Sequence, residues 1–150
     1  MAEFGLIHYN FKGTLTEFLD YARDTGFQCT ELPIQDIWNE KDNESFETAR
    51  KNAARVAEML KTRGLRASAI SAGNNFLLPD EEARRAQISR LRQICELARI
   101  VGTSLLRIDG GWITRGMSDD RELHLELIVS GISELRSFIE AEGFRLALDN

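Results

Sequence analysis

The chain has 150 residues, a length that fits one domain. It carries 19 basic and 24 acidic residues, so its net charge is -5, which argues against a nucleic-acid-binding surface. Hydrophobic residues make up 43% and charged residues 29%, a balance that excludes a disordered chain and supplies a core. No apolar run is long enough to cross a bilayer. We therefore expect a globular domain that binds neither nucleic acid nor membrane.

The N-terminus and the cysteines bear on location. The opening Met-Ala-Glu-Phe-Gly has no basic segment followed by an apolar one, so we expect no secretion signal. The two cysteines, Cys29 and Cys95, are too few for a disulfide framework and are expected to be small buried hydrophobic residues. Together these features predict a cytoplasmic protein.

The predicted elements begin with a strand from Gly5 to Asn10. The helix after it starts at Thr14, and Glu17 three residues later completes the pattern of a capping box. Three further amphipathic helices are expected from about Ser45 to Arg63, from just after Asp80 to about Val101, and from near Ser118 to before Gly143.

A glycine ends each of these helices, and a short β-type run follows at once. Gly26, Gly64, Gly102 and Gly143 carry this pattern. Glycine ends a helix in the left-handed conformation without a Cβ clash. The alternation of one strand and one helix predicts a parallel sheet with right-handed crossovers in a single domain, residues 1–150.

Two α/β architectures fit this order: an open flavodoxin-like sheet, and the first five strands of a (β/α)8 TIM barrel. The strands favour the barrel, because aliphatic residues alternate along them with small or polar ones. The central strands of an open parallel sheet are instead continuously apolar. Arg107 and Asp109 share one face of their strand, and Leu106 and Ile108 share the other. The last predicted strand runs directly into Asn150, so we expect a C-terminally truncated partial barrel. Its unpaired strand edges predict self-association or poor solubility.

In this arrangement, several stretches resemble the N-terminal part of the xylose isomerase-like TIM barrel family, whose members are described as sugar phosphate isomerases and epimerases. Each stretch alone is weakly specific, and their order and spacing carry the resemblance. They are Ile7–Phe11, Thr25–Leu32, Leu65–Ser71 with Gly73–Phe76, Leu97–Gly102 with Leu106–Trp112, and Arg145–Asn150.

The resemblance implies a divalent metal in the barrel mouth, held partly by a carboxylate at the end of the fifth strand. Asp149 takes that position, where the family more often has Glu, and is implied as both metal ligand and catalytic base. The remaining ligands are expected beyond Asn150. Oxygen-rich ligands suit Mn²⁺ or Mg²⁺, with Zn²⁺ possible where His dominates. The implied activity is isomerisation or epimerisation of a small sugar or sugar phosphate, through removal of a proton next to a carbonyl.

Four further residues are candidates for substrate binding, each with a structural alternative. His8 could contact substrate or be a satisfied structural histidine. Glu31 could bind a hydroxyl or pair with Arg107. Arg107 could bind substrate or pair with Asp109, the latter being slightly favoured. Four aromatic residues that follow strands are candidates for an apolar wall around a sugar: Phe11, Trp38, Phe76 and Trp112. Ordinary loop packing is the alternative for these four, and Trp112 is the preferred sugar contact among them.

Other functions stay open at this stage. Enolisation next to a carbonyl can end in water loss, so an inosose dehydratase-like lyase of the same family is one alternative. A non-enzymatic flavodoxin-like binding domain is another, and it predicts a strand order with the first strand inside the sheet. An endonuclease IV-like phosphodiesterase is disfavoured by the acidic balance. Asn74 and Asn75 are interpreted as turn residues.

Overall fold

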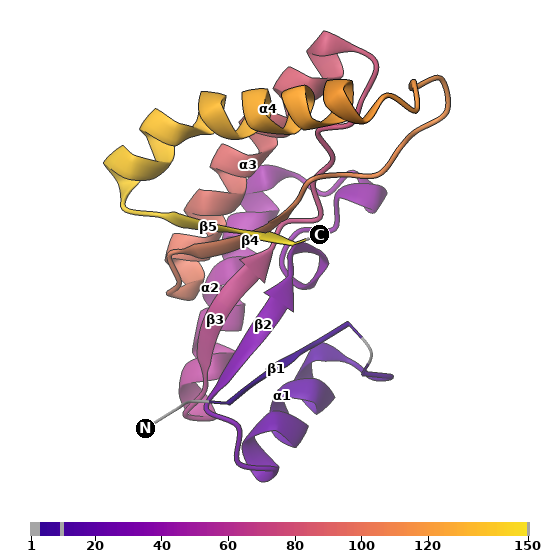
Figure 1. Ribbon diagram of the computed structural model, residues 1–150. Coiled ribbons are helices and arrows are strands. Elements are labelled where there is room, and N and C mark those ends of the chain that lie inside the picture. The colour runs from indigo at the N-terminus through magenta and orange to yellow at the C-terminus, as the bar shows by residue number, and fades with distance from the viewer. Residues whose placement is uncertain (1–3, 10, 150) are drawn as a thin grey trace.

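A computed structural model describes residues 4–9 and 11–149. Five parallel strands form one sheet in the order β1-β2-β3-β4-β5 (Figure 1). Sequential order, with a crossover helix between neighbouring strands, is the arrangement of a TIM barrel and excludes the flavodoxin-like order. The strands are β1 (Gly5–Ile7), β2 (Cys29–Pro33), β3 (Arg66–Ser71), β4 (Leu105–Asp109) and β5 (Arg145–Asp149).

Four α-helices connect the strands, and two 3₁₀ turns, Ile34–Asp36 and Glu40–Asp42, follow β2. In Figure 1, α2 and α3 lie behind the sheet and α4 lies along its upper end. The helices are α1 (Leu15–Asp24), α2 (Phe46–Thr62), α3 (Glu81–Val101) and α4 (Arg121–Glu142).

The helix starts follow from the capping residues. Thr14 and Glu17 form the predicted capping box, with Glu17 Oε2 accepting from the Thr14 backbone N–H at 2.7 Å. Ser45 and Asp80 cap α2 and α3 as expected. The fourth helix begins slightly later than predicted, because Asp120 accepts the backbone N–H groups of its first turn.

The first strand is shorter than predicted. It ends at Ile7, and His8 and Tyr9 form a turn. Asn10, the predicted end of this strand, lies outside the described residues.

The core lies between the sheet and its helices. On β4, Leu106 and Ile108 are buried under the helices, while Arg107 and Asp109 are half-buried on the opposite face. The predicted alternation is therefore confirmed on this strand. The two cysteines are free and buried, as predicted. One face of the strand packs against the helices. The polar residues of its other face therefore lie on the concave side of the sheet.

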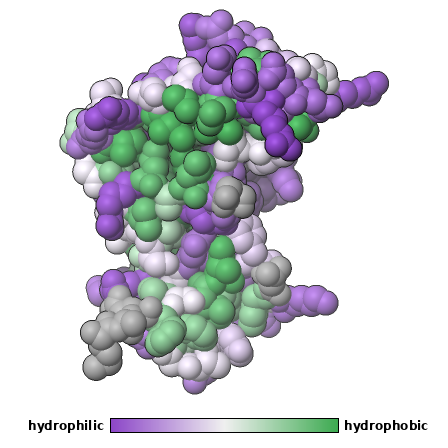
Figure 2. Space-filling view, in the orientation of Figure 1, coloured by the Kyte–Doolittle hydropathy of each residue, from purple (hydrophilic) through white to green (hydrophobic). Residues whose placement is uncertain are grey.

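Exposed apolar residues lie on β5 and on the helix before it. Leu148 on β5 is 54% exposed, and Leu125 and Val129 on α4 are also exposed. Figure 2 shows a larger apolar group over α4 and β5 and a smaller one over β1 and α1. Among the described residues, no helix is long and apolar enough to span a membrane.

Candidate functional site at the carboxyl ends of the strands

Arg107 is the centre of a polar cluster on the concave side of the sheet. Its Nε donates to Glu31 Oε1 at 2.5 Å, and its Nη2 donates to Ser71 Oγ at 2.9 Å. Its Nη1 forms an ion pair with Asp149. The Tyr9 ring lies 5.4 Å from the guanidinium carbon, and the Tyr9 hydroxyl is 2.6 Å from Ser71 Oγ. These five residues from β2, β3, β4, β5 and the turn after β1 form what we call the Arg107 cluster.

The structure decides between the alternatives for Arg107 and Glu31. Pairing of Glu31 with Arg107 is confirmed. The favoured pairing of Arg107 with Asp109 is wrong: within the described residues, Arg107 forms ion pairs with Glu31 and Asp149 and none with Asp109. Asp109 and Asp149 are instead register partners on adjacent strands, so their side chains emerge side by side.

The charges of this cluster affect one another. Partial burial alone would lower the pKa of Arg107, but its hydrogen bond to Glu31 and the nearby negative charges raise it overall. Burial also raises the pKa of the Asp109 carboxyl; the Arg107 charge opposes this shift, and the Asp149 charge adds to it. The site thus holds a permanently charged guanidinium beside a carboxyl whose proton is held more tightly than usual.

His8 lies apart from the Arg107 cluster. Its Nδ1 is 2.9 Å from Asp36 Oδ2, and its ring stacks on Phe18 of α1 at a centroid distance of 4.5 Å. Burial raises the pKa of the Asp36 carboxyl, and the bond to His8 partly offsets that shift. The geometry matches the structural alternative for His8, while its contact with substrate remains a prediction.

Two connected depressions lie at the carboxyl ends of the strands. The inner depression, about 630 Å³, is lined by Tyr9, Gly73, Asp109, Gly110, Gly111, Trp112, Ile128, Leu148 and Asp149. The outer depression, about 740 Å³, is lined by Gln35, Trp38, Asn39, Glu40, Lys41, Gly73, Asn75, Leu78, Gln87, Arg90, Trp112 and Thr114. Both volumes fall in the range of small-molecule sites, roughly 300–1,000 Å³. They share Gly73 and Trp112, so they are neighbouring parts of one opening.

Asn74 and Asn75 are more than turn residues. Asn74 is fully buried; its amide nitrogen donates to the Asp109 carbonyl at 2.8 Å, and its oxygen accepts the Asp109 N–H at 3.0 Å. Asn75 holds the Trp112 backbone in the same two-sided way, at 3.1 and 3.0 Å. A Cβ at Gly111 would lie 2.0 Å from Asn75 Oδ1, so this approach requires glycine. The signal available in the sequence was the Asn pair after one strand and the Gly pair after the next.

The predicted aromatic wall is only partly present. Trp38 and Trp112 line the outer depression, and Trp112 is 57% exposed. Phe11 instead packs against Phe18, with ring centroids 5.6 Å apart.

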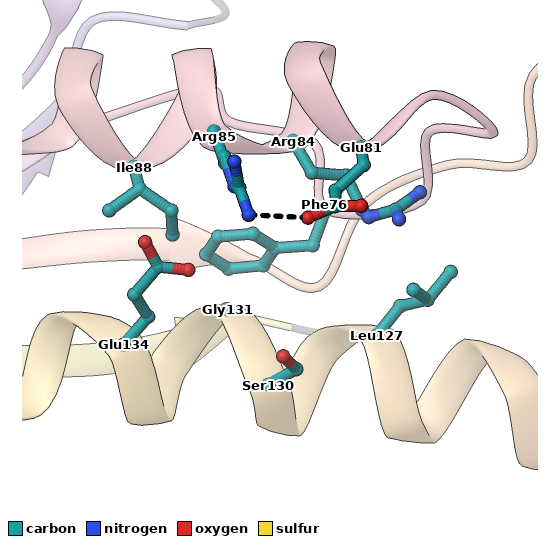
Figure 3. A pocket seen from close by; sticks show the side chains of 9 residues that line it. All are labelled: Phe76, Glu81, Arg84, Arg85, Ile88, Leu127, Ser130, Gly131 and Glu134. Carbon is teal, nitrogen blue, oxygen red and sulfur yellow. Dashed lines mark ion pairs between the residues drawn. The ribbon is translucent and has the colours of Figure 1, made fainter.

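Phe76 also lies elsewhere, between α3 and α4 (Figure 3). It is 1% exposed, and a Cβ at Gly131 would come within 2.6 Å of its ring. The cleft around it, about 220 Å³, is bordered by the ion pair of Glu81 and Arg85 at 2.6 Å. It lies in the helical layer, so we do not place the functional site there.

The donors for a metal are carboxylate oxygens. Asp109 and Asp149 both line the inner depression. Their oxygens suit a hard divalent cation. Among residues 4–9 and 11–149, no three His, Cys, Asp or Glu side chains are grouped closely enough to hold an ion. The described residues therefore fit part of a metal site.

The chain resembles known proteins in sequence and in fold. The family described as xylose isomerase-like TIM barrel matches residues 19–150. No curated protein matches significantly.

Solved structures share the fold. A D-psicose 3-epimerase determined with D-fructose has 13% identity and a TM-score of 0.77 over 98% of this chain and 52% of its own. The IolI protein with a bound zinc atom has 17% identity and a TM-score of 0.77 over 98% and 51%. A 3-keto-D-glucoside 4-epimerase from E. coli has 16% identity and a TM-score of 0.71 over 96% and 54%. The chain thus spans about half the length of these structures.

Proposed function

The chain belongs to the xylose isomerase-like TIM barrel family, and on that premise we propose that the protein is a divalent-metal-dependent isomerase or epimerase of small sugars. The proposal concerns the whole protein, because the chain spans about half the length of its solved relatives. The observation that carries it is the side-by-side placement of Asp109 and Asp149 on adjacent strands, facing the inner depression. Named relatives that act on sugars support it.

In this proposal Asp149 removes the proton from the carbon next to the sugar carbonyl and returns it in the product. A general base must lie where it can reach that carbon. Asp149 is part of the inner depression and about half of its side chain is exposed, so it is accessible to a ligand there. Asp109 beside it has a raised pKa, which suits a carboxyl that holds a proton during exchange.

Arg107, Glu31 and Trp112 orient the sugar in this proposal. The guanidinium donates hydrogen bonds in a fixed plane, and the Glu31 carboxylate accepts them from hydroxyl groups. The exposed Trp112 ring offers a flat apolar surface to the C–H face of a sugar. His8 acts on the sugar site only indirectly in this proposal, because its Nδ1 is hydrogen-bonded to the Asp36 carboxylate.

The proposed metal would be held by Asp149, with further ligands expected beyond Asn150, in the part of the whole protein that this chain does not span. When bound, a divalent ion would polarise the carbonyl and hydroxyl oxygens of the sugar. Since Arg107 already pairs with Asp149, a cation has to compete with that guanidinium. Mn²⁺, Mg²⁺ and Zn²⁺ are the ions to compare.

Hydrogen exchange tests the proposal directly. The whole protein is incubated in D₂O with Mn²⁺ and D-fructose, D-psicose or D-tagatose, and NMR follows deuterium at the carbon next to the carbonyl. We expect deuterium to enter and the epimer or isomer to appear, with loss of both in Asp149→Asn. The matched control is Asp119→Asn, an exposed carboxylate before α4. A dehydrated product would favour the dehydratase-like lyase over the isomerase. Absence of deuterium exchange with all of these sugars would contradict the proposal.

A further inference from the structure

The outer depression has a lining that the proposed reaction does not use. It is about 740 Å³ in volume and is bordered by the turns after β2, the loop after β3, α3 and the loop after β4. It adjoins the inner depression through Gly73 and Trp112. A ligand reacting beside Asp149 could therefore extend past Trp112 into this second space.

Two charged side chains in the lining of the outer depression, Arg90 and Glu40, balance each other's charge. Arg90 donates to both Glu40 oxygens, at 2.6 and 2.5 Å, and to the Ala72 carbonyl at 2.9 Å. Both side chains are largely buried, at 15% and 31% exposure, so this bidentate pair is held in place. A compensated pair of this kind offers no strong attraction to an anion.

Side-chain amide groups in the same lining supply further hydrogen-bond donors and acceptors. Gln87 Oε1 accepts the Asn75 backbone N–H at 3.3 Å, which orients its amide nitrogen for a second partner. Gln35 is exposed, and its amide nitrogen lies over Gly73 at the junction of the two depressions. Lys41 adds a charged ammonium group with three donors. Together with the neutral amide donors and acceptors, it can bind the hydroxyl groups of a polyol.

Two tryptophans in the lining of the outer depression supply apolar surfaces. Trp38 is fixed because its Nε1 donates to the Glu44 carbonyl at 3.0 Å and its ring packs edge-on against Phe46 at 5.4 Å. Trp112 is held by its backbone bonds to Asn75. Flat rings bordering a space lined by amides are the contacts that the C–H faces and hydroxyl edges of a sugar ring require.

We propose that the outer depression is a subsite for a second, uncharged sugar-sized group, so that the substrate class is a glycoside or disaccharide. The proposal rests on the proposed function for its inner, reacting sugar. The inner depression receives the sugar that carries the carbonyl, and the outer one receives the attached glycosyl group, with Trp38 and Trp112 in its lining.

The chain contains only two tryptophans, so their fluorescence reports on this subsite directly. In the 150-residue chain, Trp112→Phe leaves Trp38 as the only tryptophan and Trp38→Phe leaves Trp112. Each variant is titrated with the reducing disaccharides cellobiose, maltose and lactose, after circular dichroism confirms that it is folded. We expect at least one disaccharide to change Trp38 emission saturably, and the same titration of the wild-type chain serves as a check.

Second-site variants locate the binding. Gln87→Ala and Lys41→Ala should each weaken the response about fivefold, the loss of roughly one hydrogen bond. Gln93→Ala, a glutamine on the same helix outside the depression, should leave it unchanged. The proposal is overturned if no disaccharide changes Trp38 emission, or if Gln87→Ala and Lys41→Ala leave the response intact.

The Asp149→Asn variant separates this inference from the proposed function. It should abolish deuterium exchange and keep the disaccharide response of Trp38. A Trp38 response in a wild-type protein that exchanges hydrogen on neither the monosaccharides nor the bound disaccharide refutes the proposed function alone. Exchange of a monosaccharide without any Trp38 response to disaccharides refutes the subsite alone.

Discussion

Arg107 on β4 reaches Asp149 on β5 although the two are not register partners. The register partner of Arg107 is Ala147, whose small side chain leaves room for the guanidinium to extend along the strand. The same guanidinium also binds Glu31 two strands away. With its bond to Ser71 on β3, one side chain thus joins four neighbouring strands, β2 to β5, at the mouth of the site.

Removal of this tie should destabilise the fold. The side chains of Arg107 and Glu31 are 21% and 22% exposed, so their pairing is only partly screened by water. A double-mutant cycle of Arg107→Ala and Glu31→Ala, followed by urea unfolding, should give a coupling energy of about 0.5–3 kcal/mol. The matched control is the exposed pair of Arg136 and Glu140, which should couple by about 0.5 kcal/mol or less. Equal coupling in both pairs would contradict the expectation.

Asn75 should control both stability and the position of Trp112. Asn75→Ala leaves the Trp112 N–H and carbonyl and the Leu77 N–H without their partner in a buried setting. We expect a loss of about 1–3 kcal/mol in unfolding free energy and easier acrylamide quenching of Trp112. The quenching is measured in the Trp38→Phe background. Gln93→Ala serves as control, and unchanged quenching in Asn75→Ala would show that the loop holds its shape without this clamp.

The elements and their order could be predicted because they depend on local signals. Thr14 with Glu17, Ser45 and Asp80 mark helix starts through contacts with their own first turns. Glycine after each helix marks the αβ connection. The repeated crossover predicts parallel strands, and the alternating faces of strands such as β4 favour the sequential barrel order over the flavodoxin-like one.

The site depends on contacts that no local pattern encodes. Which acid Arg107 pairs with depends on the register of four strands, including a shift between Thr30 and Glu31. The clamps of Asn74 and Asn75 join segments about 35 residues apart, as the hydrogen-bond separations show. Phe76 follows a strand, as Trp38 and Trp112 do. The space for its ring is nevertheless provided by Gly131, which lies in a helix distant in the sequence.

Gly131→Ala tests that packing relationship. In an isolated helix Ala is more favourable than Gly by about 1 kcal/mol. Here the added Cβ would lie 2.6 Å from Phe76, so we expect a net destabilisation of about 1–3 kcal/mol. Phe76→Leu combined with Gly131→Ala should recover part of the loss, because the smaller side chain removes the clash. Urea unfolding of the wild type and these two variants measures this, and a stabilised Gly131→Ala would show that the helices separate freely.

Cys95 should make stability fall at high pH. Burial raises the pKa of its thiol from the ordinary 9.0 to about 12. Between these values the unfolded chain loses the proton while the folded chain keeps it, so unfolding free energy declines as pH rises through this window. Cys95→Ala should flatten that decline relative to Cys29→Ala, the other buried thiol. Iodoacetamide at pH 8 should leave Cys95 unmodified until urea is added; rapid modification of the folded chain would contradict its burial.

The open edge at β5 should drive self-association of the chain. β5 pairs with β4 on one side, and Leu148 is 54% exposed beside the apolar surface of α4. An exposed strand edge with apolar side chains is a template for pairing with another chain. Sedimentation velocity at increasing concentration should therefore show growing complexes of the wild-type chain. Leu148→Lys should reduce them more than Leu125→Lys, because a charge on the strand itself opposes edge pairing, whereas Leu125 is on the helix. A wild-type chain that stays monomeric at every concentration would mean that β5 does not act as a pairing edge.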